Sequence, residues 1–434
     1  MDKTESLPDD ALAHILGRLQ PRDLAATRCV RKAWCAIVDG RRLLLPHLLP
    51  RAVRGLFLNY GDHARFFASP SSTPIHSDLS FLPRCGGSST ELVDHCGGLL
   101  LHRDWRTLCV INPATRRWED LPWEDDGCDA YLAFDLAESL HYQVFSVPSD
   151  PEKVVLNPHD ELEEDLIECP PSTWNINVFS SSTRQWQRRS FVREAEAPKT
   201  VLHPISMPWS RQRGRRSVYW RGSLYAQFYG VFLVRLSLSN GKYRVIETPI
   251  NDEESIPVQS YVGRSENGVY FATVYDGCRL QVWTLMESSE RVDWVSKKHI
   301  DLGTTALPLY LPDYMEGIEK TWILDDDDDV NGNNRNIKTE NLDWDSDDDN
   351  IVNIEDSYQY SHTYVSFLGF HPYKEVVFLA LTSYKGPVAM AYHLNNSKFQ
   401  YLGQLADYSH GARIQGSFPY TPCVTGHLLY HFTE

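Results

Sequence analysis

The side chains that could carry chemistry in this 434-residue chain are dispersed, and few of them stand at the spacings of a catalytic or metal site. The best metal candidate is Asp327–Gly332, which matches the first six positions of a calcium-binding loop. Position twelve of such a loop needs a bidentate glutamate, and Lys338 stands there instead. Nucleophile-elbow, zinc-protease, dinucleotide-binding and phosphate-loop motifs do not occur in the sequence. We therefore predict no catalysis, no metal and no cofactor.

Histidine and cysteine side chains are the next candidates. His95, His102 and His141 have no companion at a metal-ligand spacing, so they are interpreted as ordinary strand or loop residues. Cys96 stands beside two glycines and could be a nucleophile with a distant histidine, but a small buried thiol is the simpler interpretation. The nine cysteines contain no C-x-x-C pair, which indicates reduced thiols in the cytoplasm or nucleus.

One basic cluster, Arg211–Arg216, holds four arginines and is flanked by Trp209, Tyr219 and Trp220. Arginines interleaved with aromatic residues can bind nucleic acid or serve as a nuclear import signal. The chain as a whole carries 58 acidic and 42 basic residues, a net charge of −16, which disfavours phosphate neutralisation as its main task. We expect a solvated loop here or, as the alternative, a patch that recognises an acidic partner.

The composition is that of a globular protein, with 42% apolar and 12% aromatic residues. No apolar run reaches the roughly 18 residues that a membrane span needs, and the first ten residues lack a secretory pattern. We therefore expect neither secretion nor membrane insertion. Most of the acidic excess lies in residues 325–356, where 13 acidic residues accompany 2 basic ones. Such a segment is expected to be a disordered loop inserted between strands of one blade of a β-structure, either a solvated spacer or a contact for a basic target.

The first 45 residues have helical periodicity and differ from everything after them. Leu12, Ile15, Leu16 and Leu19 form one apolar stripe after the helix-start residues Leu7-Pro8-Asp9-Asp10. Pro21 interrupts this segment, and a second stripe runs from Val30 through Trp34 to Val38. About 40 residues rarely build a self-sufficient core, so the stripes predict either a protein-binding face or a helical cap on the rest of the chain.

These residues resemble an F-box. The resemblance rests on Leu7-Pro8, Ile15-Leu16-x-x-Leu19, Pro21-Arg22-Asp23-Leu24 and the run Arg28–Ile37, in order and at the spacing of the family. It implies an F-box over residues 1–45 that docks on the Skp-type adaptor, and through it on the cullin, of a ubiquitin ligase. The adaptor-binding residues that it implies are Leu7, Pro8, Ile15, Leu16, Leu19, Leu24, Val30 and Trp34.

Beyond residue 50, strand-like runs alternate with turns, and one hairpin pattern repeats. Each copy has an apolar strand, a polar turn and an aromatic residue that opens a second strand. The five copies are Leu108–Trp118, Asn177–Trp186, Leu233–Tyr243, Val282–Trp294 and Ala391–Phe399. Their aromatic markers recur at steps of about 50 to 70 residues, with one longer step that holds the acidic segment.

Recurrence at this period favours a ring of four-stranded blades, a β-propeller, over an open β-sandwich or two stacked β-domains. The apolar strand candidates nearest the ends of the β region are Gly55–Tyr60 and Gly426–Phe432, and we predict that they pair to close the ring. The fold class expected is therefore mainly β, with three N-terminal helices followed by a propeller.

A second resemblance lies in Cys96–Leu101, Asn112–Pro122 and Leu132–Phe145, which are similar to the kelch-like F-box-associated region of plant F-box proteins. It implies a kelch-like propeller over residues 46–434, including the acidic loop at 325–356. Together the two resemblances imply a non-catalytic substrate receptor of an SCF-type ubiquitin ligase, with an unknown target protein on the propeller. The alternatives are a propeller that binds a small molecule or glycan, and an enzyme on a propeller scaffold.

Overall fold

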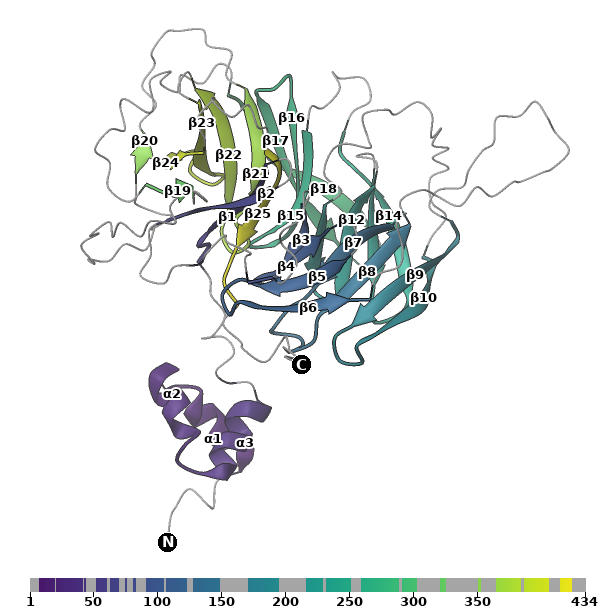
Figure 1. Ribbon diagram of the computed structural model, residues 1–434, viewed down its shortest axis with the longest axis vertical. Helices are drawn as coiled ribbons and strands as arrows, with labels where there is room; N and C mark the ends of the chain where they lie inside the picture. Colours follow the sequence, from purple (N-terminus) through teal and green to yellow (C-terminus); the bar gives the residue numbers. More distant parts are fainter. Residues whose placement is uncertain are drawn as a thin grey trace, which may run out of the picture.

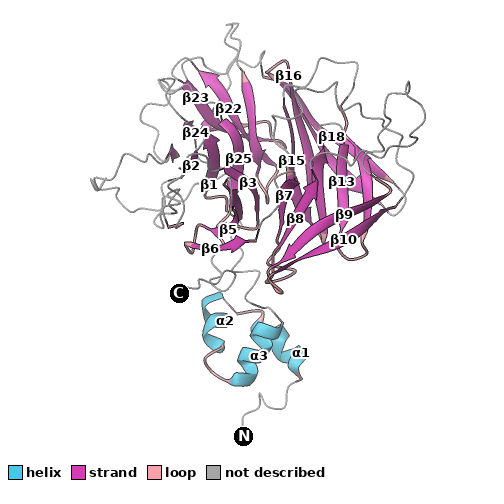
Figure 2. Cartoon of the chain, turned by 45° about the vertical axis from the view of Figure 1, so that its right-hand side comes forward, coloured by secondary structure: helices cyan, strands magenta, loops and turns pink. Residues whose placement is uncertain are grey.

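The computed structural model describes residues 8–19, 21–41, 43, 52–60, 63–69, 75, 81–82, 91–104, 107–122, 128–148, 171–194, 216–228, 232–250, 259–288, 291–302, 321–324, 350–352, 364–383, 386–405 and 414–423. Three helices come first: α1 (Asp9–Leu16), α2 (Pro21–Thr27) and α3 (Lys32–Gly40). Asp9 and Asp10 occupy the first turn of α1, where their negative charges stabilise the helix by interacting with the positive end of its dipole. In Figures 1 and 2 the three helices lie outside the body that the strands form.

The described residues contain twenty-five strands, most of them in antiparallel four-stranded meanders that we number as blades. Blade 1 contains β3 (Glu91–Cys96), β4 (Leu99–Arg103), β5 (Leu108–Asn112) and β6 (Arg117–Leu121). Blade 2 contains β7 (Cys128–Ala133), β8 (Gln143–Pro148), β9 (Thr173–Ser180) and β10 (Gln185–Arg193). Blade 3 contains β11 (Ser217–Trp220), β12 (Ser223–Phe228), β13 (Phe232–Ser237) and β14 (Lys242–Glu247).

Blade 4 contains β15 (Gln259–Ser265), β16 (Gly268–Tyr275), β17 (Arg279–Glu287) and β18 (Val292–Asp301). Blade 5 contains β21 (Val365–Phe370), β22 (Val376–Ser383), β23 (Gly386–His393) and β24 (Phe399–Gln404), with the short β20 (Ile351–Val352) on its outer edge. Blade 6 contains β25 (Ile414–Tyr420), β1 (Gly55–Tyr60), β2 (His63–Ala68) and the short β19 (Ile323–Leu324). Blades 2 and 3 share one sheet because β10 and β14 pair in parallel at their ends.

The first strands of the blades contact one another in a closed cycle, β3 to β7, β11, β15, β21 and β25, and then back to β3. A sandwich has no such cycle, so the mainly β, propeller-like prediction is confirmed. Closure into a ring covers the face of every blade with its neighbours and leaves each blade only an outer edge strand.

The predicted closing pair was half right. Gly55–Tyr60 is β1 as expected, but it pairs with β25 over Gly55↔Tyr420 to Tyr60↔Ile414. The predicted partner, Gly426–Phe432, lies outside the described residues. Ile414–Tyr420 contains two polar residues, a glycine and a proline, which made it a weaker strand candidate than the apolar run after it. Because the last described strand sits inside the blade that holds the first, both ends of the β region are tied into one sheet.

The five aromatic markers occupy equivalent places, at or near the start of the fourth strand of blades 1 to 5. Each pairs across its hairpin with an apolar residue of the third strand: Ile111↔Trp118, Phe179↔Trp186, Leu236↔Tyr243, Leu285↔Trp294 and Tyr392↔Phe399. In four of these hairpins the residue two positions before the marker has a positive φ: Arg116, Arg184, Gly241 and Ser397. The repeat predicted from the sequence is therefore present in both pairing and backbone conformation.

The repeat predicts that all five markers are largely buried, but the structure buries only two of them fully. Tyr243 and Phe399 are fully buried, whereas Trp118, Trp186 and Trp294 are half-buried at the rim. Two of the tryptophans bond to the neighbouring blade: Trp186 Nε1 donates to the Pro122 carbonyl (2.6 Å), and Trp294 Nε1 donates to the Glu247 carbonyl (2.7 Å). The outermost strand has one sheet face near solvent, so a large indole there is held partly by packing and partly by this hydrogen bond.

The acidic segment 325–356 lies almost wholly outside the described residues, as do the calcium-loop candidate and Lys338. Its flanking strands show that, contrary to the prediction, it does not interrupt one blade. β19 pairs with β2 of blade 6, and β20 pairs with β24 of blade 5. The segment therefore connects the outer edges of two neighbouring blades. Trp322 is buried beside this seam, and its backbone N–H donates to the Leu402 carbonyl (2.6 Å).

Two substitutions test the repeat. We expect Tyr243→Ala to lower the free energy of unfolding by about 3–5 kcal/mol, because it leaves a large cavity. Trp294→Phe keeps most of the packing and removes one hydrogen bond, so it should cost only about 1 kcal/mol. Urea denaturation followed by far-ultraviolet circular dichroism measures both, and equal losses would contradict the assignment of buried and rim positions.

Candidate functional site

The helical segment has a core of its own. Leu12, Leu16, Leu24, Ile37 and Val38 are buried together, and Ala13, Leu19, Trp34 and Leu43 pack against this cluster. An ion pair between Arg28 and Asp39 (2.8 Å) joins the end of α2 to α3, and this hydrogen-bonded guanidinium holds the pKa of Asp39 below its ordinary value. A second ion pair joins Arg41 to Asp10. The helices therefore form one packed unit.

The structure divides the predicted adaptor-binding residues into three groups. Leu16 and Leu24 are buried in the helical core, and Leu19 and Trp34 are half-buried at its margin. Pro8 is exposed at the start of α1, and the side chains of Ile15 and Val30 are 50% and 60% exposed. Leu7 lies outside the described residues. A helical period predicts which residues share a stripe, but it cannot divide that stripe between an internal core and an external partner.

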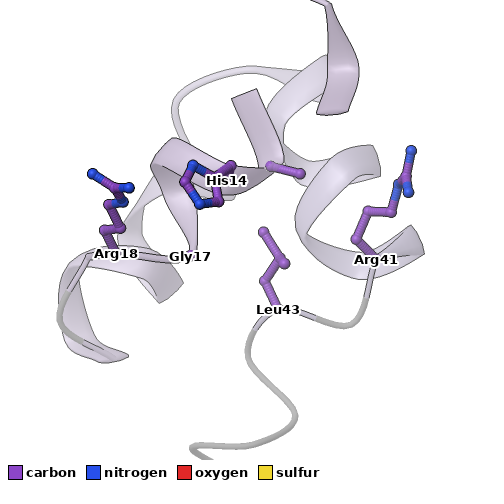
Figure 3. A pocket seen from close by; sticks show the side chains of 6 residues that line it. His14, Gly17, Arg18, Arg41 and Leu43 are labelled. Carbon is purple, nitrogen blue, oxygen red and sulfur yellow. The ribbon is translucent and has the colours of Figure 1, made fainter. Parts of the chain in front are cut away.

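A shallow hollow of about 510 Å³ lies beside α1 and the end of α3. It is lined by Ala13, His14, Gly17, Arg18, Arg41 and Leu43. Figure 3 shows His14 and Leu43 across from one another, with Arg18 and Arg41 at the two sides. Its wide opening and mixed polar lining suit a protein side chain better than an enclosed small molecule.

The axis of the ring is occupied by polar side chains, and Asp94 of β3 is their centre. Asp94 Oδ2 accepts hydrogen bonds from the Leu132 N–H (2.8 Å) and the Ser217 hydroxyl (2.7 Å), and Oδ1 accepts one from the His95 N–H (2.8 Å). Leu132 and Ser217 belong to blades 2 and 3. Burial raises the pKa of Asp94 to about 7, against the opposing effect of these bonds and of Arg216.

Arg216 carries this network to the other three blades. Its guanidinium lies 3.9 Å from the ring centre of Tyr261 in blade 4 and donates to the Ser417 carbonyl in blade 6 (3.0 Å). The Ser417 hydroxyl donates in turn to the Leu368 carbonyl of blade 5. We call the set Asp94, Ser217, Arg216, Tyr261 and Ser417 the axial network; through it all six blades are connected.

The axial network corrects the prediction for one member of the basic cluster. Arg216 is an internal connector between blades, not part of a solvated loop or surface patch. Arg211, Arg213, Arg215 and Trp209 lie outside the described residues. A run of arginines in the sequence gives no signal that its last member enters the ring, because that depends on where β11 begins.

The chemistry candidates near the axis are poorly suited to catalysis. Desolvation raises the pKa of the Cys96 thiol to about 12, and its Sγ donates to the Phe134 carbonyl (3.0 Å). Desolvation, together with Arg216, lowers the pKa of His95 to about 4. A thiol that stays protonated is a poor nucleophile. Within the described part of the chain, no three His, Cys, Asp or Glu side chains gather as a metal site would require, and no helix is long and apolar enough to cross a membrane.

Comparisons with known proteins agree with the F-box resemblance of the helical segment. Residues 4–44 match the F-box-like family. An F-box protein of Arabidopsis thaliana is 24% identical over 337 residues, which cover 72% of this chain and 76% of that protein. Another Arabidopsis thaliana F-box protein is 21% identical over 327 residues, which cover 69% of this chain and 71% of its own length. The predicted resemblance to plant F-box proteins is thereby confirmed.

Two solved structures match this chain at low sequence identity and low TM-score. The β-propeller domain of Nup133 from Vanderwaltozyma polyspora is 12% identical, with a TM-score of 0.30, over 79% of this chain and 88% of that one. AztD from Citrobacter koseri is 8% identical, with a TM-score of 0.34, over 82% and 87% of the two chains.

The pKa of Asp94 generates a prediction about stability and pH. A carboxyl group whose pKa rises on folding binds its proton more tightly in the folded state, so stability falls as pH rises from about 4 to about 7. A tenfold difference in proton affinity between the folded and unfolded states corresponds to about 1.4 kcal/mol. We expect Asp94→Asn to flatten this fall, measured as melting temperature against pH, whereas Asp120→Asn at an exposed position should not. Parallel pH profiles for the wild type and Asp94→Asn would contradict the assignment.

Proposed function

We propose that this chain is the substrate-recognition subunit of a cullin-based, SCF-type ubiquitin ligase. The F-box-like helices would dock on a Skp-type adaptor, and the β ring would hold the protein to be ubiquitinated. The observation that carries the proposal is the coincidence of the F-box-like match at residues 4–44 with a packed helical unit that exposes apolar residues. The proposed division is an F-box over residues 1–45 and a kelch-like propeller over 46–434.

The proposed docking surface consists of the exposed apolar residues of the F-box-like helices. Ile15 and Val30 are aliphatic and at least half exposed, which favours burial by a partner. Trp34 and Leu19 are half-buried and would contribute their remaining surface. Leu16 and Leu24 would act indirectly, by keeping the three helices packed. A core of five buried residues is small, so a partner that covers the exposed aliphatic side chains would also stabilise the unit.

The proposed contribution of this chain to ubiquitination is proximity. Cys96 and His95 at the axis have pKa values unsuited to nucleophilic catalysis, and no reaction step needs to be assigned to them. A receptor that holds its target beside a conjugating enzyme raises the effective concentration of the target's lysines. Such complexes would form in the cytoplasm or nucleus, where the free thiols of this chain stay reduced.

The docking surface can be tested by charge substitution. In Ile15→Glu with Val30→Glu, each change removes an anchor worth about 2 kcal/mol, so adaptor affinity should fall by about 1,000-fold. The chain offers a matched control, Leu140→Glu, since Leu140 is 54% exposed on the ring. Co-purification with a Skp-type adaptor and titration by calorimetry measure the effect.

A second pair of variants separates folding from docking. Leu16→Ala with Trp34→Ala should also lose the adaptor, but through a lower helix content and an earlier melting transition, because Leu16 is in the helical core. The Ile15 and Val30 double variant should keep the wild-type melting temperature. If it also keeps wild-type adaptor binding, the docking surface is elsewhere and the proposal for these residues fails.

A further inference from the structure

The first strands of the six blades end around one end of the ring axis, which we call the mouth of the ring, and each strand brings one residue to it. These residues are Cys96, Asp135, Trp220, Arg264, Tyr373 and Thr421, at or just after the ends of β3, β7, β11, β15, β21 and β25. Contacts of Arg264 join four of them across blades. The chain enters β1 at the same end of the ring, since the Arg54 N–H donates to the Tyr420 carbonyl (2.9 Å).

Arg264 is held at this mouth by aromatic rings more than by acceptors. Its Cζ lies 4.6 Å from the ring centre of Trp220 and 5.4 Å from that of Tyr373. Its ion pair with Asp135 has an N–O distance of 3.8 Å, longer than a hydrogen bond. Nε is buried and has no hydrogen-bond partner among the described residues. The guanidinium is therefore fixed in place while most of its donor capacity is unused.

A second guanidinium lies over the same indole. Arg221 and Gly222 both have positive φ in the two-residue turn between β11 and β12, and Arg221 Cζ lies 5.2 Å from the Trp220 ring centre. Arg221 is exposed. The turn thus brings the side chains of Arg221 and Arg264, from two blades, onto one tryptophan.

Two of the three acidic residues near these arginines accept hydrogen bonds from other groups. Asp135 Oδ1 accepts the Ala137 N–H (2.9 Å), and Glu138 Oε2 accepts the Tyr219 hydroxyl (2.6 Å). Glu266 is exposed on the turn after β15. Among the described residues, only Asp135 pairs with either arginine, and its N–O distance to Arg264 is 3.8 Å. The two guanidinium groups each lie over the Trp220 indole and make one long ion pair with these acidic residues, so donors remain that could bind an anionic oxygen group.

We propose that this mouth binds an acidic side chain of the target protein, with Arg221 and Arg264 as its anion ligands. The proposal rests on the proposed function and names the chemistry of the target segment that the ring would recognise. Arginine suits this role because its planar fork matches both oxygens of a carboxylate, and the aromatic platform fixes its orientation in advance. A phosphorylated side chain offers the same oxygen geometry, so the experiment includes it.

The test uses the full chain and three fluorescein-labelled peptides in anisotropy titrations. The probes are hexaglutamate, the same peptide with a central phosphoserine, and neutral hexaglutamine. We expect both anionic peptides to bind and hexaglutamine to bind at least about 10-fold more weakly. Arg264→Gln and Arg221→Asn should each weaken anionic binding by about 10-fold, the loss of one charge-assisted contact. Tighter binding of the phosphoserine peptide, lost in both variants, would identify phosphate as the preferred anion.

The chain supplies a matched control. Arg116 is exposed and also has a positive φ, at an outer hairpin turn of blade 1, and asparagine tolerates that conformation as it does at position 221. Arg116→Asn should leave peptide affinity within about 2-fold of wild type, because an exposed charge outside the site has only a small effect on binding. Arg264→Lys keeps the charge but loses the fork, and it should restore only part of the affinity.

Two outcomes would overturn the inference: equal binding of hexaglutamine, or anionic binding that survives in the Arg221→Asn, Arg264→Gln double variant. Adaptor co-purification with the same proteins separates this failure from that of the proposed function. A chain that binds its adaptor but shows no arginine-dependent peptide binding contradicts only the site at the mouth. A chain that binds the peptides through these arginines but no adaptor contradicts only the ligase assignment.

Discussion

The ring depends on one buried carboxylate. Asp94 accepts from its own blade, from blade 2 and from blade 3, and Arg216 extends the same network to blades 4 and 6. Strand pairing holds each blade together, and apolar clusters pack each blade against the next. The polar contacts at the axis add links between the inner strands of different blades. A fully buried acid is costly unless it is hydrogen-bonded. Here three donors and a nearby guanidinium offset part of that cost, and the remainder appears as the pKa raised to about 7.

Closure of the ring takes place within blade 6, and a second set of contacts lies at the seam between blades 5 and 6. β25 brings the C-terminal part of the chain beside β1, so unfolding of either end disrupts a sheet made from both. Trp322 then packs between Phe67 of blade 6 and Phe378 of blade 5, while its backbone bonds to Leu402. Gly403 permits this, since a Cβ at that position would collide with the Trp322 carbonyl. The acidic segment begins at residue 325, three residues after Trp322.

The features that the sequence predicted well are those encoded locally. Tyr243 and Phe399 stand at the same point of a hairpin because an apolar strand, a turn and an aromatic residue repeat, and that pattern is visible without coordinates. The closing strand and the position of Arg216 depend on how distant segments meet, and no local pattern specifies them. Ile15 and Leu16 show the same limit at the scale of one helix turn: both belong to one stripe, yet one is exposed and the other is core.

This limit explains why the mouth of the ring could not be predicted from the sequence. Trp220, Arg264 and Tyr373 are separated by dozens of residues, and they meet only because each lies at or near the end of the inner strand of a different blade. The axial network links those strands, and the strands place the backbone of both arginines and of the aromatic residues, while contacts with Trp220 orient the two guanidinium groups. A ring of this kind can change its surface residues without changing its frame, which separates the residues that maintain the fold from those available to recognise a target.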